Sequence, residues 1–270
     1  MCHFVNTTNY MTPFYKFHGT GNDFILLDGF NNKVVTTPAT IKEACDRHMG
    51  IGADGLIIIA PSEEADFRML YYNSDGSRAT MCGNGARCAV ALCKMLEIAS
   101  SDIAFMADDG FHIASAQLVS DGMWDVEVKM NDAEHPIKTD GVWYINTGTP
   151  HIVKLVDNVN GIEPTIEGPV LRNDIRFQPN GVNVNWVAMT PGNILVRTYE
   201  KGVEDETLSC GTGVTASAIV GGMLTNERKW RVETKGGSLQ VSFDIHPDSF
   251  KNIRLRGPAK LVFTGETTLF

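Results

Sequence analysis

The chain has 270 residues, and its 32 Asp and Glu against 23 Lys and Arg give a formal net charge of −9. This acidic balance disfavours nucleic acid or an anionic membrane surface as the main partner, and no apolar run approaches the roughly 20 residues of a membrane span. With 43% hydrophobic residues, the composition is that of a globular protein. The length suffices for one large core or for two domains of roughly 130 residues.

The N-terminus and the cysteines bear on the cellular compartment. The first dozen residues have neither the basic nor the apolar region of a secretory signal, and we interpret them as a poorly ordered extension. The cysteines are too sparse for a disulfide scaffold and lack the Cys-x-x-Cys pairs of a zinc site. They are Cys2, Cys45, Cys82, Cys88, Cys93 and Cys210. We therefore expect a reducing, cytoplasmic location and no metal site.

Apolar patterning in the first half predicts several strands and two helices. Strands are predicted over residues 14–18, 23–28, 56–60, 67–72, 103–106, 111–119 and 124–130. An amphipathic helix is predicted over 38–48. A second helix, over 83–99, is apolar on nearly every side, which is typical of a helix buried within a domain.

The second half repeats this pattern after a turn-rich break at residues 131–136. Strands are predicted over 143–146, 152–156, 182–189, 194–199, 230–234, 239–243, 253–255 and 261–263, with a buried helix over 214–224. Because buried helices need strands around them, we expect an α+β fold of two pseudo-symmetric domains, each a curved mixed sheet wrapped around one helix. The expected domains are residues 1–130 and 131–270, and the last strand, about 260–270, could return to the first domain.

A short motif occurs once in each half. Cys-Gly-Asn-Gly at residues 82–85 and Cys-Gly-Thr-Gly at 210–213 each open a predicted buried helix, and the two cysteines are 128 positions apart (210 minus 82). Glycines at a helix start let unpaired N–H groups approach an anion, and a cysteine there would have its thiolate favoured. Two such units facing one carboxylate place a thiol on each side of its α-carbon. The motif pair therefore predicts a two-base racemase or epimerase.

Other candidate residues permit both a functional and a structural interpretation. Asn22 lies in a glycine-flanked turn, where it either contacts a ligand or only forms the turn. His151 either orients a thiol or is a solvated loop residue. Glu200 and Lys201 either hold a zwitterionic substrate or form an exposed charge pair. Asn73 and Asn183 are stronger candidates, whereas helical Cys45, Cys88 and Cys93 are better interpreted as buried structural thiols.

Several motifs, in order from about residue 14 to the C-terminus, resemble those of the diaminopimelate epimerase family. They are His-Gly-Thr-Gly-Asn-Asp-Phe at 18–24, Gly-Ile-Gly-Ala-Asp-Gly at 50–55, Tyr-Asn-Ser-Asp-Gly-Ser at 72–77, Cys-Gly-Asn-Gly-Ala-Arg-Cys at 82–88, Gly-Thr-Pro-His at 148–151, Val-Asn-Val at 182–184, and Glu-Lys-Gly at 200–202 before Cys-Gly-Thr-Gly. The resemblance implies two sheet-around-helix domains with the active site in the cleft between them. It also implies a homodimer and an isomerase that needs neither pyridoxal phosphate nor another cofactor.

The resemblance further assigns roles to individual positions. Cys82 and Cys210 become the acid/base thiols, with His151 and Glu200 close to them. The backbone amides around Gly83, Asn84, Gly211 and Thr212 become the clamp on the reacting carboxylate. The rest of the substrate is then held by Asn22, Asn73, Asn183, Glu200 and Lys201. The implied reaction interconverts L,L- and meso-diaminopimelate, in lysine and peptidoglycan precursor biosynthesis.

Three positions depart from the pattern common in this family. Lys201 stands where an arginine is common, Thr149 where an asparagine is, and Gly55 where a glutamine is. A lysine keeps the charge but loses the two-pronged grip of arginine on a carboxylate. Thr149 and Gly55 are thus further candidates for substrate binding. Two alternatives remain open: a racemase of another amino acid such as histidine or proline, and a non-catalytic redox-sensing relative in which the two thiols form a reversible disulfide.

Overall fold

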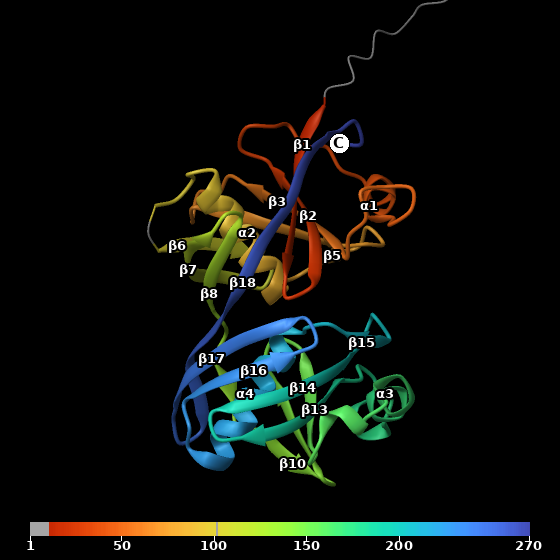
Figure 1. Cartoon of the computed structure of the whole chain (residues 1–270), viewed down its shortest axis with the longest axis vertical. Coiled ribbons are helices and arrows are strands. Elements are labelled where there is room, and N and C mark those ends of the chain that lie inside the picture. Colours follow the sequence, from red (N-terminus) through yellow and green to blue (C-terminus); the bar gives the residue numbers. More distant parts are fainter. Residues whose placement is uncertain (1–10, 101) are drawn as a thin grey trace, which may run out of the picture.

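The computed structural model describes residues 11–100 and 102–270, and the predicted N-terminal extension lies outside the described residues except for its last two positions. Two lobes lie one above the other, and each is built around one central helix (Figure 1). No helix among the described residues is long and apolar enough to cross a membrane. The α+β fold predicted from the sequence is confirmed.

The first lobe contains one complete set of elements, which we call the first repeat. These are β1 (Thr12–Gly19), β2 (Asn22–Asp28), α1 (Pro38–Cys45), β3 (Gly55–Ala60), β4 (Phe67–Asn73), β5 (Arg78–Ala79), α2 (Gly83–Met95), β6 (Ile103–Ala107), β7 (Gly110–Ser120) and β8 (Met123–Lys129). The sheet is mixed: β2 and β3 pair in parallel, as do β4 and β6, and the other pairs in this repeat are antiparallel.

The second repeat follows the short strands β9 (Ala133–Glu134) and β10 (Ile137–Thr139) and has the same order of elements. It consists of β11 (Val142–Asn146), β12 (Pro150–Leu155), α3 (Pro164–Arg172), β13 (Asn183–Thr190), β14 (Asn193–Glu200), β15 (Asp205–Thr207), α4 (Gly211–Thr225), β16 (Lys229–Thr234), β17 (Gly237–Ile245) and β18 (Ser249–Thr267), with two short 3-10 turns over Val159–Gly161 and Ile175–Phe177. The parallel pairs recur at the equivalent places, β12 with β13 and β14 with β16. This agreement in connectivity and strand direction supports an internal duplication.

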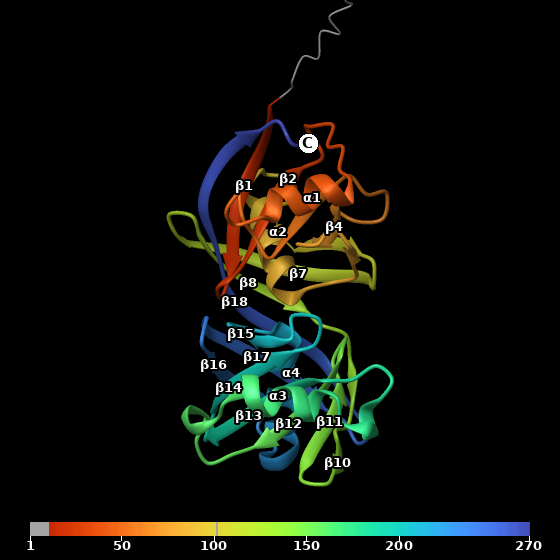
Figure 2. The same cartoon turned by 90° about the vertical axis from the view of Figure 1, so that its right-hand side faces the viewer.

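The strand β18 links the two lobes (Figure 2). Its first part, Phe250 to Arg256, pairs with β17, and its remainder, Gly257 to Thr267, pairs with β8 and then β1. Separate strands over 253–255 and 261–263 were predicted, and this was wrong. Inward and outward positions alternate through Gly257 and Pro258, so a dipeptide typical of a turn lies inside one long strand.

The two central helices are buried as predicted. In α2 the residues from Gly83 to Cys93 are all buried, and in α4 burial is nearly continuous from Gly211 to Gly222. Cys45, Cys88 and Cys93 belong to the apolar cores, which confirms their structural interpretation. Helix α3 was not predicted. Its nine residues include two prolines and a glycine, which disfavour a helix when the sequence alone is considered.

Candidate functional site

Cys82 and Cys210 occupy equivalent positions, the N-caps of α2 and α4. Both have extended backbone conformations, and neither side chain makes a capping hydrogen bond. The first helical hydrogen bonds run from the amide of Ala86 to the carbonyl of Cys82 and from the amide of Val214 to the carbonyl of Cys210. The backbone N–H groups between each donor and its acceptor therefore make no hydrogen bond within the helix and remain available to bind an anion.

The two helix ends meet at their first glycines. A Cβ atom placed on Gly211 would lie 3.4 Å from Gly83 Cα and 3.8 Å from the Asn84 nitrogen. A Cβ placed on either glycine would also lie 3.1 Å from Leu255 Cδ2, which is closer than side chains usually approach. Glycine at both positions therefore lets two helix N-termini converge on one place, with one cysteine beside each.

The helix ends favour the thiolates, as predicted, but burial opposes them more strongly. Burial raises the pKa of Cys82 to about 11, and it also raises the pKa of Cys210. The Glu200 carboxylate adds to both increases, whereas backbone amides of the first helical turn lower the pKa of each thiol. For both thiols the loss of water therefore outweighs the stabilisation of the thiolate by these amides.

Glu200, the last residue of β14, lies beside Cys210. Its Oε2 accepts a hydrogen bond of 3.0 Å from the Thr207 hydroxyl. Burial raises the pKa of Glu200, and the contacts with Thr207 and with the Cys210 thiol partly offset that rise. A carboxylate whose pKa is raised in this way is a better proton acceptor than an exposed one. Glu200 is therefore suited to accept the proton of Cys210, the more buried of the two thiols.

His151 is completely buried behind Thr212 rather than solvated in a loop. Its Nε2 lies 2.9 Å from Thr212 Oγ1 and 3.0 Å from Thr149 Oγ1, and Thr212 Oγ1 lies 3.4 Å from Cys210 Sγ. Burial lowers the pKa of His151 to about 3, so the ring is neutral. Contact with Cys210 runs through the Thr212 hydroxyl.

Asn185 determines which nitrogen of His151 carries the proton. Its Nδ2 donates to the Ile152 carbonyl at 2.9 Å and to His151 Nδ1 at 3.1 Å, while its Oδ1 accepts from the Thr198 hydroxyl at 2.9 Å. These partners fix the orientation of the amide, so Nδ1 of His151 must accept and Nε2 must carry the hydrogen. The His151 Nε2–H can then donate to Thr212, whose own O–H can donate to Cys210 Sγ.

Cys82 is surrounded by a different set of side chains. Its thiol donates to Asn22 Oδ1 at 3.6 Å, and Asn84 Nδ2 donates to the same oxygen at 3.2 Å and to the Ser209 carbonyl at 2.8 Å. Asn22 begins β2 after the turn at Thr20 and Gly21, both with positive φ. Asn84 therefore connects the first turn of α2 to the residue preceding Cys210.

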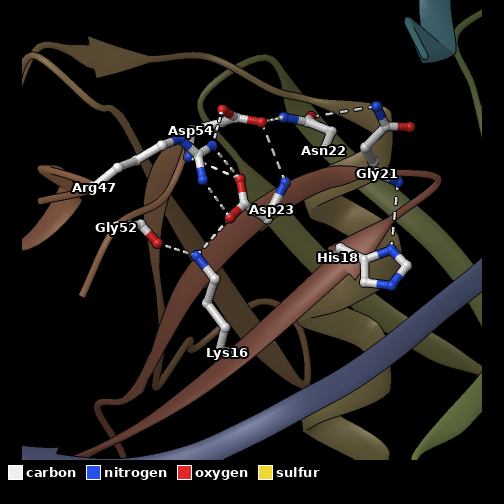
Figure 3. A network of polar contacts seen from close by, with 9 residues as sticks. Lys16, His18, Gly21, Asn22, Asp23, Arg47, Gly52 and Asp54 are labelled. Atoms are coloured by element: carbon white, nitrogen blue, oxygen red, sulfur yellow. Dashed lines mark hydrogen bonds and ion pairs between the residues drawn. The ribbon is translucent and has the colours of Figure 1, made fainter. Parts of the chain in front are cut away.

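Behind Asn22 lies a group of ion pairs, shown in Figure 3. Asp54 Oδ2 accepts from Asn22 Nδ2 at 2.7 Å, and Arg47 bridges Asp54 and Asp23 at 2.6 and 2.7 Å. Lys16 pairs with Asp23 at 2.6 Å. Asp54 thus fixes the Asn22 amide, whose oxygen accepts from the Cys82 thiol. Arg47 in turn holds Asp54 in place (Figure 3).

A cleft of about 690 Å³ opens between the two repeats in front of Cys82. Its lining includes five of the residues predicted from the sequence, namely Asn22, Asn73, Cys82, Glu200 and Lys201. Cys210 is only 6% exposed and lies outside this lining, as do His151 and Asn183. One thiol therefore faces the cleft while the other is covered.

The remaining predicted residues lie around the second repeat or beneath the cleft. Asn183 Oδ1 accepts from the Lys201 amide at 2.7 Å, and its Nδ2 donates to Thr149 Oγ1 at 3.2 Å. Lys201 Nζ donates to the Asn180 carbonyl at 3.1 Å. Gly55 is buried outside the cleft lining, and a Cβ there would lie 2.9 Å from Tyr71 Cε2. The Tyr72 carbonyl, 2.6 Å from that position, and the Tyr71 ring occupy this space, and Tyr71 also lines the cleft.

Sequence reasoning missed several residues of this site. Asn185, Arg47, Asp54, Tyr71 and Ser209 all contact the predicted residues or line the cleft, and the Ser209 hydroxyl is buried without a partner among residues 11–100 and 102–270. Of these residues, only Asn185 had a signal in the sequence: it lies two positions after Asn183 on the same strand and so on the same face. Within the described part of the chain, no group of three or more His, Cys, Asp or Glu could hold a metal ion.

Comparison with known proteins identifies the family of this chain. The family model for diaminopimelate epimerase matches residues 14–135 and 143–262. Diaminopimelate epimerase of Flavobacterium psychrophilum is 43% identical over 262 residues, covering 94% of this chain and 99% of that protein. The corresponding protein of Chlorobaculum tepidum is 38% identical over 262 residues, covering 93% and 99%.

Solved structures of lower identity share the fold. A PhzF-family phenazine biosynthesis protein of Bacillus anthracis has a TM-score of 0.71 at 15% identity, covering 96% of this chain and 99% of that one. A hydroxyproline epimerase of Agrobacterium vitis has a TM-score of 0.70 at 13% identity, covering 95% and 92%. On the extent of the family match and the identity to its curated members, this chain belongs to the diaminopimelate epimerase family.

Proposed function

We propose that this protein interconverts L,L- and meso-diaminopimelate by proton transfer between two cysteines, without a cofactor. The observation that carries the proposal is the convergence of two cysteine-capped helix N-termini at Gly83 and Gly211. The backbone N–H groups that are free at both helix N-termini can bind one carboxylate. Cys82 and Cys210 then lie on opposite faces of the adjoining α-carbon.

In the proposed reaction one cysteine is a thiolate and the other a thiol. The thiolate takes the α-proton, and the electron pair of the broken C–H bond moves into the carboxylate, where the two helix ends stabilise the added charge. The other thiol then gives its proton to the opposite face and becomes the thiolate. Glu200 provides the initial acceptor for the Cys210 proton, a role supported by its position beside that thiol and its raised pKa.

The cleft residues would hold the remote end of the substrate. Diaminopimelate has a second amino-acid group, which needs both a cation and hydrogen-bond acceptors. Lys201 supplies the cation, and Asn22, Asn73 and Glu200 supply polar groups on the cleft wall. Asn183 would act by fixing the Lys201 backbone rather than by contact with the cleft.

We further propose that residues 1–130 and 131–270 form two domains that close around the substrate, with β18 as a shared strand. A cytoplasmic homodimer is proposed on the family resemblance and the reduced state expected of the thiols. Neither metal nor pyridoxal phosphate takes part in the proposed reaction, because the helix ends themselves stabilise the charge that leaves the α-carbon.

Incubation of the reduced protein with L,L-diaminopimelate tests this proposal. We expect formation of the meso isomer, with deuterium entering the α-position when the solvent is D₂O. L-Histidine and L-proline serve as parallel substrates. Turnover of one of these instead would keep the two-thiol reaction and overturn the substrate, and absence of exchange with all three would overturn the reaction.

A further inference from the structure

Arg87 is a buried cation that the proposed reaction does not yet use. Its side chain is 0% exposed, although arginine is almost never fully buried without a counter-charge. The guanidinium donates only to neutral oxygens: Gly83 O at 3.2 Å, Asn84 Oδ1 at 3.0 Å, Thr20 Oγ1 at 3.2 Å and Pro258 O at 3.3 Å. Its hydrogen bonds are satisfied while its charge is not.

No carboxylate among the described residues lies within ion-pair distance of this guanidinium. The strands β1, β2 and β18, which pack against α2, carry several charged or titratable side chains, among them Lys16, His18, Asp23, Asp28, Arg254, Arg256 and Lys260, and Asp23 is already paired with Lys16 and Arg47. Burial lowers the pKa of Arg87, and the Cys88 and Cys82 thiols act in the opposite direction. A buried charge of this kind is costly unless an anion balances it.

Two hydrogen-bonded routes lead from Arg87 to Cys82. Arg87 Nη1 donates to the Gly83 carbonyl, and the amide on the other side of that peptide bond, Asn84 N–H, acts on the Cys82 sulfur. Arg87 Nη2 donates to Asn84 Oδ1, and Asn84 Nδ2 donates to Asn22 Oδ1, which accepts from the Cys82 thiol. A charge at one end of such a chain polarises each donor along it.

The surroundings hold the guanidinium at this position. A Cβ on Gly19 would lie 3.0 Å from both Arg87 Nη2 and Asn84 O, so a glycine at the end of β1 gives the guanidinium room at this position. Pro258 belongs to the part of β18 that crosses between the lobes. The side chain is therefore fixed by elements of both the N-terminal and the C-terminal parts of the chain.

We propose that Arg87 is a positioning residue whose buried charge makes the α2 end of the site electropositive, and that it stabilises either the Cys82 thiolate, whenever that thiol loses its proton, or the substrate carboxylate held by the Asn84 amide. The second alternative rests on the proposed function, whereas the first concerns the free protein. Arg87 touches neither substrate nor reacting atoms and acts through the Gly83–Asn84 peptide and the Asn84 side chain.

A matched pair of variants separates charge from structure. Arg87→Thr removes the charge but keeps a hydrogen-bond donor. The equivalent residue of α4 is Thr215, whose hydroxyl donates to the carbonyl of the first helical glycine, Gly211, at 2.9 Å. Arg87→Lys keeps a charge. Thr20→Ala removes one acceptor of the guanidinium without altering its charge and controls for simple loosening of the turn.

The first readout is alkylation of Cys82 by iodoacetamide in the free protein, followed by peptide mass analysis at pH 9. We expect Arg87→Thr to slow this alkylation about tenfold, because loss of the cation disfavours the thiolate by about one pKa unit. Thr20→Ala should remain near the wild-type rate. A merely structural role predicts the opposite sign, since a loosened site exposes the thiol, and an unchanged or faster rate in Arg87→Thr would overturn the proposal.

The second readout is the ratio of kcat/KM between Arg87→Lys and the wild type across pH 6–9. A lysine buried here has a lowered pKa, so its charge is present at low pH and lost as pH rises. The ratio should therefore fall with increasing pH, and a flat ratio would overturn the proposal even if Arg87→Thr failed to fold. If the wild type did not epimerise diaminopimelate, the proposed function would fail, while the alkylation readout would still decide the role of Arg87.

Discussion

The first turns of α2 and α4 share one backbone arrangement and differ in charge. In both helices the residue five positions after the N-cap cysteine donates to the carbonyl of the first helical glycine: Arg87 to Gly83 and Thr215 to Gly211. The first donor is a cation and the second a neutral hydroxyl. Duplication thus preserved the hydrogen bond that supports each helix end, while the electrostatics of the two ends diverged.

The surroundings of the two thiols differ in charge in the same way as the two helix ends. Cys82 faces the cleft and has amide side chains and a buried cation nearby, whereas Cys210 is covered and has Glu200 and a neutral imidazole relay nearby. One end is suited to holding negative charge, and the other has its own proton acceptor. A two-base reaction requires the thiols to differ in protonation, and these surroundings supply that difference.

The largest expected effect comes from removing either thiol. Cys82→Ala and Cys210→Ala should each lower the epimerisation rate by a factor of about 10²–10⁴, the usual worth of a positioned acid or base. Neither side chain caps its helix, so the melting temperature should change little. Cys88→Ala, at a buried core thiol, is the control and should affect stability more than turnover. Wild-type turnover by either active-site variant would refute a two-thiol reaction.

Glu200→Gln should have opposite effects on thiol alkylation and on epimerisation. The Glu200 carboxylate raises the pKa of both thiols, so its loss should lower those pKa values and speed alkylation of the free protein at pH 8. Epimerisation should nevertheless slow by a factor on the order of 10–100, because Cys210 loses its proton acceptor. Parallel assays of iodoacetamide labelling and turnover check this pair of opposite effects. If both rates rose together, Glu200 would act only by raising the pKa of the thiols and would not be the proton acceptor of Cys210.

Asn185→Ala tests the relay behind Cys210. Without the Asn185 amide, nothing else in the described network requires His151 Nδ1 to accept, so the ring can adopt the other tautomer. We expect kcat to fall about tenfold, equivalent to one hydrogen bond. ¹⁵N NMR of the imidazole should show the Nε2–H form in the wild type and a mixture in the variant. An Nδ1–H form in the wild type would contradict the assigned tautomer, and an unchanged spectrum in the variant would show that Asn185 does not determine it.

The smallest effect concerns acid stability of the first repeat. Burial alone would raise the pKa of Asp23, but hydrogen bonds and charges from Arg47 and Lys16 outweigh it and lower that pKa to about 2. The resulting stabilisation is present above the unfolded-state pKa and lost as pH falls from about 4 to 2. Asp23→Asn should therefore lower the free energy of unfolding at pH 7 by about 2 kcal/mol, with a smaller difference at pH 2. Denaturant titrations at the two pH values measure both, and an equal difference would exclude the ion pairs as its cause.

Much of the architecture followed from patterns in the sequence. The repeated Cys-Gly-x-Gly units and the uniformly apolar helices predicted two sheet-wrapped helices, because a helix apolar on all sides has to be buried. Helix α3 escaped prediction because its prolines disfavour a helix and only Pro164 and Gly168 are buried. The single long β18 escaped because Gly257 and Pro258 are typical of a turn.

The chemistry of the site was less accessible from sequence. Helix N-termini predict thiolates, yet the burial that opposes them depends on the packing of both repeats around the cysteines. Asn185 is a polar residue in an apolar strand and Arg87 lies in the Cys-Gly-Asn-Gly-Ala-Arg-Cys motif, but neither pattern indicates what the side chain contacts. Their roles arise from partners far along the chain, Thr198 and Ile152 for Asn185, and Thr20 and Pro258 for Arg87.

The central claim is that two different thiols serve opposite faces of one α-carbon, and isotope distribution at low conversion tests it most directly. Unlabelled L,L-diaminopimelate is incubated with the reduced protein in D₂O and stopped after a few per cent of turnover. We predict deuterium at the inverted carbon of the meso product and protium in the recovered substrate, because the removed proton and the added deuteron belong to separate sulfurs. Product that retains the original protium, or substrate labelled as fast as product, would indicate a single base and contradict the account.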